Sequence, residues 1–197
     1  MAPNPLRVVA DVALVVIVAA CGRRSAGAPV PESSIDRTVY GAVMNAVLTA
    51  GLPDTLLVAE STLVFRSVST GAADPRVPLD TVPLGLRTRL AEVSLKRSAS
   101  RALPLPLPIR IVTDSELRSI FQRGPMDGWP EFYRRYPKQR SWYAFSPVAF
   151  SADRLQAYVY YEYNCGDVCG GGEGFWFVRS RNDSTWRVRL RVMYWVS

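Results

Sequence analysis

The 197-residue chain contains no histidine. Histidine serves as the general base in Ser-His and Cys-His catalytic arrangements, and its imidazole is the commonest metal ligand in proteins. Without it, a hydrolase built from this chain would have to use carboxylates, lysine or tyrosine. We therefore predict no catalytic residue, no metal site and no cofactor, and the sequence favours a non-catalytic role.

Lysine is nearly absent as well, because all of the 24 basic residues except Lys96 and Lys138 are arginine. Against 17 acidic residues, this gives a net charge of +7. A GC-rich genome would explain the arginine content without any functional role. Attraction to an anionic surface, such as phospholipid headgroups or envelope polysaccharide, is the functional alternative.

The sequence also lacks an apolar run of the ~20 residues that a transmembrane helix needs. The run Val12–Ala20 contains nine uncharged residues, with Arg7 before it and Cys21 directly after it. A short run of this kind is typical of the hydrophobic region of a signal peptide, so we predict a signal peptide over residues 1–20. Plain secretion after cleavage and an uncleaved N-terminal anchor are the alternatives.

The residues Val18-Ala19-Ala20-Cys21 resemble the lipobox of bacterial lipoproteins. In that family the cysteine is lipidated and becomes the first residue of the mature protein. The resemblance implies a lipid anchor on Cys21 and a location in the bacterial cell envelope, facing the periplasm or the exterior. The membrane is then a partner through the anchor, and nucleic acid is not an expected partner despite the basic charge.

The rest of the chain is predicted to be a flexible tether at 21–34 and a single globular domain at 35–197 of the α+β class. Apolar residues from Val39 to Leu48 recur at spacings of three and four, which predicts an amphipathic helix that begins at Ser33 or Ser34. Thr113 and Glu116 form a capping box for a further helix. Other predicted elements are strands at 55–61 and 109–112, helices at 86–96, 116–122 and 129–136, a loop at 67–84 and a turn at 124–128.

The last third of the sequence predicts an antiparallel β-meander, with strands at 142–150, 155–164, 174–180 and 185–196. In the final strand, apolar residues from Trp186 to Tyr194 alternate with Arg187, Arg189 and Arg191. Such alternation is typical of a strand with one face on the core and the other in water. We expect the N-terminal helix to cover the apolar face of this sheet.

The motif Cys-Gly-x-x-Cys-Gly-Gly-Gly-x-Gly at 165–174 resembles the C-terminal part of a group of bacterial secreted and lipoprotein domains of unknown function. The likeness covers residues 146–197 best. It implies the same fold and the same cellular address, and it carries no activity to this chain. The glycines at 170–172 are expected to form a hairpin loop.

In an oxidising compartment, Cys165 and Cys169 are expected to form a disulfide, because lipidation would occupy Cys21. The alternative is a thiol-redox or copper-handling pair, because Cys-x-x-x-Cys resembles the copper site of certain thioredoxin-like assembly factors. Those factors add a histidine that this chain lacks. Glu162, Asp167 and Glu173 flank the glycine run and form a third candidate, the carboxylate pair of a hydrolase.

A candidate binding surface interleaves basic and aromatic residues between 133 and 143. Its members are Arg134, Arg135, Tyr136, Lys138, Arg140 and Trp142. The alternative is a solvated loop whose aromatic rings turn into the core. Together these features predict a lipid-anchored binding or scaffolding module, directed to an anionic envelope component or to another envelope protein.

Overall fold

The computed structural model describes residues 32–47, 54–65, 81–96 and 98–197 of the chain. The predicted signal peptide, Cys21, most of the tether and most of the loop at 67–84 lie outside these residues. Among the described residues, no helix is both long and apolar enough to cross a membrane.

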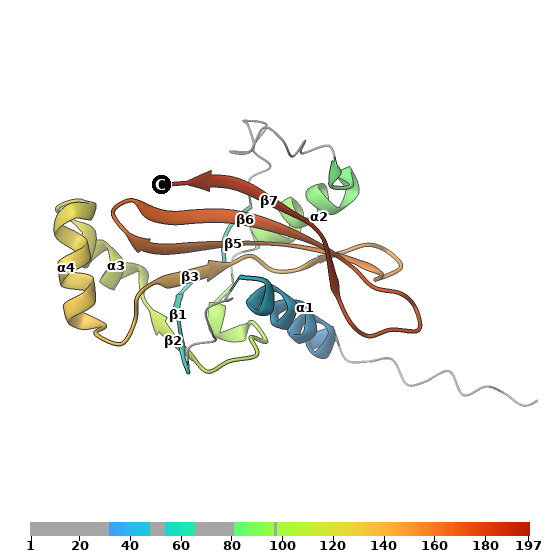
Figure 1. Ribbon diagram of the computed structural model, residues 1–197, viewed down its shortest axis with the longest axis horizontal. Coiled ribbons are helices and arrows are strands. Elements are labelled where there is room, and N and C mark those ends of the chain that lie inside the picture. Colours follow the sequence, from blue (N-terminus) through green and yellow to red (C-terminus); the bar gives the residue numbers. More distant parts are fainter. Residues whose placement is uncertain (1–31, 48–53, 66–80, 97) are drawn as a thin grey trace, which may run out of the picture.

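A seven-stranded sheet in the order β2-β1-β3-β5-β6-β7, with β4 beside β5, forms the centre of the described part of the chain (Figure 1). The strands β3, β5, β6 and β7 pair antiparallel, so the predicted α+β class and the C-terminal meander are confirmed. A parallel portion, in which β1 pairs with both β2 and β3, was not predicted. The strands are β1 (Leu56–Ala59), β2 (Ile109–Val112), β3 (Trp142–Phe145), β4 (Ala149–Phe150), β5 (Gln156–Gly166), β6 (Cys169–Val178) and β7 (Arg187–Val196).

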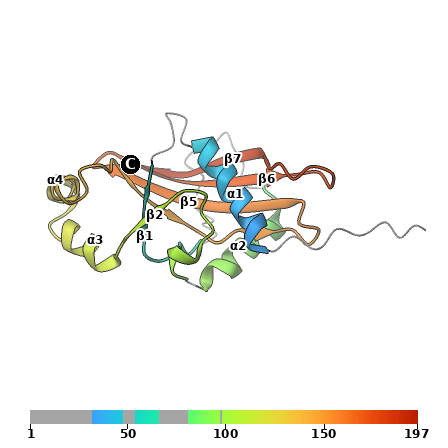
Figure 2. The same cartoon turned by 90° about the horizontal axis from the view of Figure 1, so that it is seen from below.

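Helix α1 (Glu32–Val47) runs across one face of the sheet (Figure 2). Its predicted apolar stripe is buried, with Val39 and Val43 at 0% exposure, and it packs with Phe175 of β6. The hydroxyl of Tyr40 satisfies its hydrogen-bonding capacity by donating to the carbonyl of Ser146 at 2.8 Å. The helix begins at Glu32, so residues 32–34, which we assigned to the tether, belong to the folded domain.

Helix α2 (Leu84–Leu95) covers the opposite face, where Leu86 and Leu90 pack with Tyr158 and Val192. Both faces of β5 carry buried side chains, so the expectation that one face of the meander meets water is wrong there. Arg187, Arg189 and Arg191 of β7 are exposed as expected. The alternation in the last strand is also interrupted. Trp186 packs on the α1 side, whereas Leu190, Val192 and Tyr194 pack on the α2 side. The β6–β7 register shifts between Trp176 and Phe177, and a shift of one residue moves side chains to the other face.

Helices α3 (Asp114–Phe121) and α4 (Pro125–Arg135) pack over β1 and β2, and a short 3-10 turn, η2 (Ser100–Ala102), precedes β2. The capping box of Thr113 and Glu116 at the start of α3 is confirmed. The predicted turn at 124–128 is wrong. Gly124 caps α4 with a φ of 101°, a conformation that glycine adopts easily, and Pro125 then occupies the first turn, where its missing N–H costs nothing.

The glycine run 170–172 lies inside β6 and pairs with β5 and β7, so the predicted hairpin loop is wrong. Aromatic side chains of the neighbouring strands lie across these glycines. A Cβ on Gly172 would be 2.1 Å from Nε1 of Trp195 and 2.2 Å from the hydroxyl oxygen of Tyr160. A Cβ on Gly174 would be 2.2 Å from the hydroxyl oxygen of Tyr158. Here glycine makes room for aromatic side chains and does not serve a turn.

Candidate functional site

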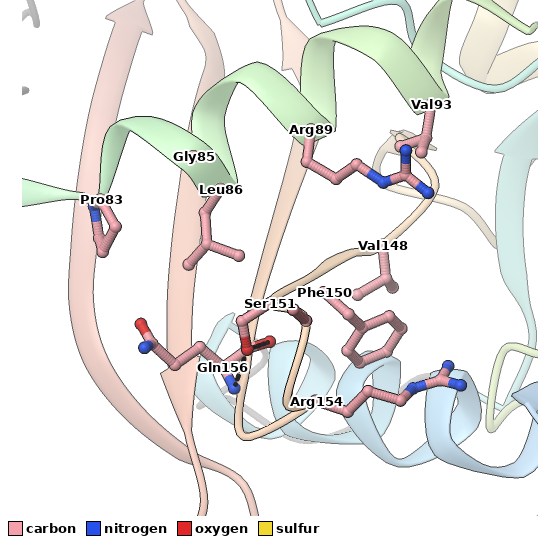
Figure 3. A pocket seen from close by; sticks show the side chains of 11 residues that line it. Pro83, Gly85, Leu86, Arg89, Val93, Val148, Phe150, Ser151, Arg154 and Gln156 are labelled. Atoms are coloured by element: carbon pink, nitrogen blue, oxygen red, sulfur yellow. Dashed lines mark hydrogen bonds between the residues drawn. The ribbon is translucent and has the colours of Figure 1, made fainter.

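A cavity of about 680 Å³ lies between α2 and the turn that joins β4 to β5 (Figure 3). We call it the α2 pocket. Its volume falls within the ~300–1,000 Å³ that is common for small-molecule sites. Apolar side chains form much of its wall, and two arginines contribute the positive charge. These residues are Pro83, Leu86, Val93, Val148 and Phe150, with Arg89 and Arg154.

The α2 wall of the pocket comes from one side of the helix, because Leu86, Arg89 and Val93 are spaced by three and four residues. A Cβ placed on Gly85 would meet no atom within 4 Å, which shows that the space beside this turn of the helix is open. The Arg89 side chain is 60% exposed. Among the described residues, its guanidinium makes one long contact, 3.4 Å to a carboxylate oxygen of Glu92, so its remaining N–H groups can reach a ligand.

The opposite wall is a tight turn that holds Arg154 in the left-handed region, with a φ of 55°. The Ser151 hydroxyl donates to Asp153 at 2.6 Å and accepts from the backbone N–H of Gln156 at 3.0 Å. The backbone N–H of Arg154 donates to the Ser151 carbonyl at 2.9 Å. The guanidinium carbon of Arg154 lies 5.0 Å from the centre of the Phe150 ring, a cation–π contact. These contacts fix the position of Arg154 at the pocket.

The Arg89 guanidinium lies near Val93, whereas the Arg154 guanidinium lies on the opposite wall, past Phe150, and both are distant from Pro83 (Figure 3). Two neutral polar side chains of the wall already have partners. The side-chain oxygen of Gln156 accepts from Nε1 of Trp176 at 3.1 Å, and Ser151 is engaged within its own turn. The pocket therefore combines an apolar wall with positive charge from Arg89 and Arg154.

The predicted binding surface is only partly assembled. Arg134, Arg135, Lys138 and Arg140 are exposed. The two aromatic members turn inward: Tyr136 is 3% exposed, and Trp142 is half-buried against the same cluster as α3 and α4. Of the aromatic residues in this stretch, Tyr133 is the one beside these positive charges that stays exposed, at 39%.

Two arginines of this surface are bonded within α4. Arg134 and Arg135 contact the Glu131 carboxylate at 2.7 and 2.5 Å. These hydrogen bonds lower the pKa of Glu131 to about 2, so it is ionised at neutral pH and offsets part of the positive charge. A groove of about 450 Å³ between α3 and α4 is lined by Arg123, Arg134 and Arg135, together with Asp127 and Glu131. Its mixture of charges makes it a weaker candidate for an anion than the α2 pocket.

Cys165 and Cys169 lie at the turn between β5 and β6, with their sulfur atoms at the disulfide distance of 1.93 Å. The Cys165 carbonyl accepts a hydrogen bond of 2.7 Å from the Tyr133 hydroxyl, which connects this turn to α4. Within the described ranges, no group of three cysteine, aspartate or glutamate side chains is placed to hold a metal ion.

Glu162 and Glu173 lie on opposite faces of the sheet, so the predicted carboxylate pair is wrong. Two residues that pair across neighbouring strands point to the same side of the sheet. Glu173 pairs with Tyr161, so it points to the same side as Tyr161. Glu162 is the next residue of β5 and therefore points to the other side. Glu173 is 1% exposed and receives two hydrogen bonds from the Arg191 guanidinium, one of them 2.7 Å long. The Glu162 carboxylate accepts from the Tyr160 hydroxyl at 2.7 Å.

No protein-family model, curated protein or solved structure matches this chain. The candidate site therefore rests on the geometry of the α2 pocket. The sequence does not reveal this pocket, because its two walls are about 60 residues apart in the chain and neither wall carries a motif. One signal was available: the turn Ser151-Ala152-Asp153-Arg154 contains no glycine or asparagine to take the left-handed position.

Proposed function

We propose that this protein is a lipid-anchored protein of the bacterial envelope whose folded domain binds an organic anion without transforming it. The observation that carries the proposal is Arg154, an arginine with a φ of 55° at the wall of an apolar pocket. Strained backbone of this kind is concentrated at functional sites.

The test is a fluorescence titration of the folded protein with 1-anilinonaphthalene-8-sulfonate, an aromatic anion that brightens in apolar sites. We expect saturable binding at one site. Charged hydrogen bonds contribute ~1.5–3 kcal/mol each, so the double variant Arg89→Gln, Arg154→Gln should bind at least about tenfold more weakly. The matched control Arg134→Gln, Arg135→Gln removes the same charge from α4 and should bind like the unmodified protein. Equal binding by both double variants would contradict the proposal.

The envelope part of the proposal rests on the likeness of residues 18–21 to a lipobox. The intact mass of the membrane-extracted protein tests it. We expect a chain that begins at Cys21 and carries added diacylglyceryl mass, and a Cys21→Ala variant that lacks this mass. An unlipidated chain cleaved at another position would instead support plain secretion.

A thiol-redox or copper-handling role for Cys165 and Cys169 is the second candidate. Cys169 is exposed at the end of the hairpin, where a reductant or a metal carrier reaches it. Replacement of both cysteines by alanine separates the two interpretations. A redox role requires that thiol–disulfide exchange or copper binding is lost while the fold remains, and a structural role requires a loss of stability alone.

A further inference from the structure

We infer that the end of the folded domain beside the start of α1 docks on an anionic phospholipid surface, through exposed arginines of the segment 179–189. We call this segment the basic turn. It joins the end of β6 to the beginning of β7. The inference rests on the lipid anchor of the proposed function and is independent of the α2 pocket. It adds which end of the domain faces the membrane and what holds it there.

The basic turn lies where the chain enters the folded domain. The start of α1 and this turn are at the same end of the molecule, and α4 is at the opposite end (Figure 1, Figure 2). Nε1 of Trp186 donates to the hydroxyl oxygen of Thr38 in α1 at 3.0 Å. Glu32, where α1 begins, is eleven residues after Cys21. An extended chain spans at most ~3.6 Å per residue, so a lipid on Cys21 would keep this end within ~40 Å of the membrane surface.

The basic turn carries more positive than negative charge. It contains four arginines and one aspartate, which gives a net charge of +3. Three of the arginines are exposed, namely Arg181, Arg187 and Arg189. Arg187 contacts Asp183 at 3.1 Å, but its side chain remains 76% exposed. Because exposed ion pairs contribute little, an anionic headgroup layer can compete with Asp183 for this guanidinium.

The surroundings of the basic turn leave this end of the protein positive. Residues 151–155 of the neighbouring turn have no net charge, and residues 32–38 of α1 have a charge of −1. The sequence between Cys21 and α1 contributes Arg23 and Arg24 and no acidic residue. With the charge of +3 on the basic turn, the sum is +4. This is the sign of charge that an anionic lipid leaflet attracts.

Contacts within the domain hold the basic turn in place. The Arg179 guanidinium lies over the Trp186 ring, 4.7 Å from its centre, and its Nε donates to the Arg154 carbonyl at 3.0 Å. The backbone N–H of Thr185 donates to the Asp183 carboxylate at 2.8 Å. The backbone that carries the exposed arginines is therefore ordered beside the start of α1, and docking does not have to order it first.

The exposed arginines are close enough to act together. Arg189 is two residues beyond Arg187 on β7, ~7 Å at the rise of an extended strand. The potential of a charged surface decays over ~8 Å at physiological salt, so a leaflet that contacts the basic turn attracts both. Arg134 and Arg135 of α4 are a weaker alternative, because Glu131 offsets part of their charge and α4 lies at the opposite end.

The test is hydrogen exchange, measured by mass spectrometry, of the lipidated protein reconstituted in two kinds of vesicle. One contains phosphatidylcholine alone, and the other contains equal parts of phosphatidylcholine and phosphatidylglycerol. Each arginine near an anionic surface strengthens the attraction about fivefold, so backbone N–H groups of the basic turn should exchange at least about fivefold more slowly in the anionic vesicles. This difference should disappear in ~1 M salt, where the screening length falls to ~3 Å.

The β5–β6 turn at 166–168 is the control within the same molecule. It contacts α4 through Tyr133 and lies at the opposite end from the start of α1, so its exchange should be equal in the two kinds of vesicle (Figure 1). Protection of this turn in place of the basic turn would show that the opposite end faces the lipid, and would overturn the inference.

The double variant Arg181→Gln, Arg187→Gln tests the side chains themselves and should lose most of the protection. The matched control Arg134→Gln, Arg135→Gln removes the same charge from α4 and should keep it. Equal exchange of the basic turn in both kinds of vesicle, or protection that survives in the first variant, overturns this inference and leaves the proposed function standing. The intact mass of the same preparation reports the anchor, and an unlipidated chain would overturn both the anchor and this inference.

Discussion

The two faces of the sheet are buried in different ways. Under α1, aliphatic and aromatic side chains are deeply buried, with Val39, Val43, Phe175 and Phe177 at 0% exposure. Under α2, the sheet presents tyrosines, and the hydroxyl groups of Tyr158 and Tyr194 lie 2.6 Å apart. The two helices differ in the same sense, because α1 has a continuous apolar stripe and α2 places Arg89 between Leu86 and Val93 on the side that lines the pocket. One face of the sheet thus carries an apolar core, and the other carries hydroxyl groups and the α2 pocket.

The largest effect is expected on the α1 side, where Glu173 is buried and depends on Arg191. Loss of one partner leaves a buried charge without compensation, so Arg191→Met should lower the free energy of unfolding by about 3 kcal/mol. Urea denaturation measures this loss. Arg189→Met, at an exposed residue two positions away on β7, is the control and should change stability by less than ~0.5 kcal/mol. Equal losses in the two variants would mean that the ion pair contributes nothing.

On the α2 side, Gly172→Ala should lower the free energy of unfolding, whereas a glycine replacement in α1 should raise it. The new methyl group would lie 2.2 Å from the hydroxyl oxygen of Tyr160 inside the packed sheet, which predicts a loss of ~1–3 kcal/mol. Gly41→Ala in α1 meets no atom within 4 Å and should stabilise by ~0.5–1 kcal/mol through helix propensity. Thermal denaturation compares the two, and stabilisation by both would show that the rings over β6 are loosely packed.

High pH should destabilise both faces through their buried tyrosines. Burial raises the pKa of Tyr40 on the α1 side, and burial followed by the neighbouring Tyr194 raises the pKa of Tyr158 on the α2 side. These tyrosines therefore contribute fully to the free energy of unfolding below the unfolded pKa of ~10, and their contribution is lost as the pH rises above it. Each such tyrosine should contribute up to ~1.4 kcal/mol of lost stability per pH unit above 10.

Denaturation midpoints between pH 8 and pH 11 test this dependence. Tyr40→Phe should flatten the curve above pH 10, since it removes one hydroxyl that the fold keeps protonated. An identical slope in the variant and the unmodified protein would show that Tyr40 ionises as easily in the fold as in the unfolded chain.

Arg154→Gly separates function from folding on the α2 side. The variant relieves the left-handed backbone and loses the contact with Phe150, and its unfolded chain is more flexible. Relief of the backbone offsets part of what the variant loses, so ligand binding should change more than stability does. Binding of the naphthalene sulfonate should weaken. A large loss of stability with unchanged binding would show that Arg154 serves the fold.

Local rules predicted the elements that depend on residues close together in the chain. The stripe from Val39 to Leu48 predicted α1, and its members from Val39 to Met44 are buried as expected. Thr113 and Glu116 predicted the start of α3. Two of the failed predictions concern glycine. Gly124 and the run 170–172 were both assigned to turns, whereas one caps a helix and the other lies under aromatic rings within a strand.

The same limit applies to the candidate sites, where local composition predicted which residues are exposed but not which residues lie together. Basic residues at 134, 135, 138 and 140 are exposed, as their composition predicted, and the two aromatic residues among them face the core. The α2 pocket could not be predicted from spacing, because it needs both the position of α2 on the sheet and the conformation of the turn at 151–154.

The sequence by itself determined the α+β class, the C-terminal meander and the helix that covers one of its faces, because periodicity and capping act over a few residues. The tertiary structure alone decided that a second helix covers the other face, that Glu162 and Glu173 point apart, and that Arg89 and Arg154 line one pocket. Register shifts and helix docking determine which side chains share a face. They depend on contacts between residues far apart in the chain, which no local pattern specifies.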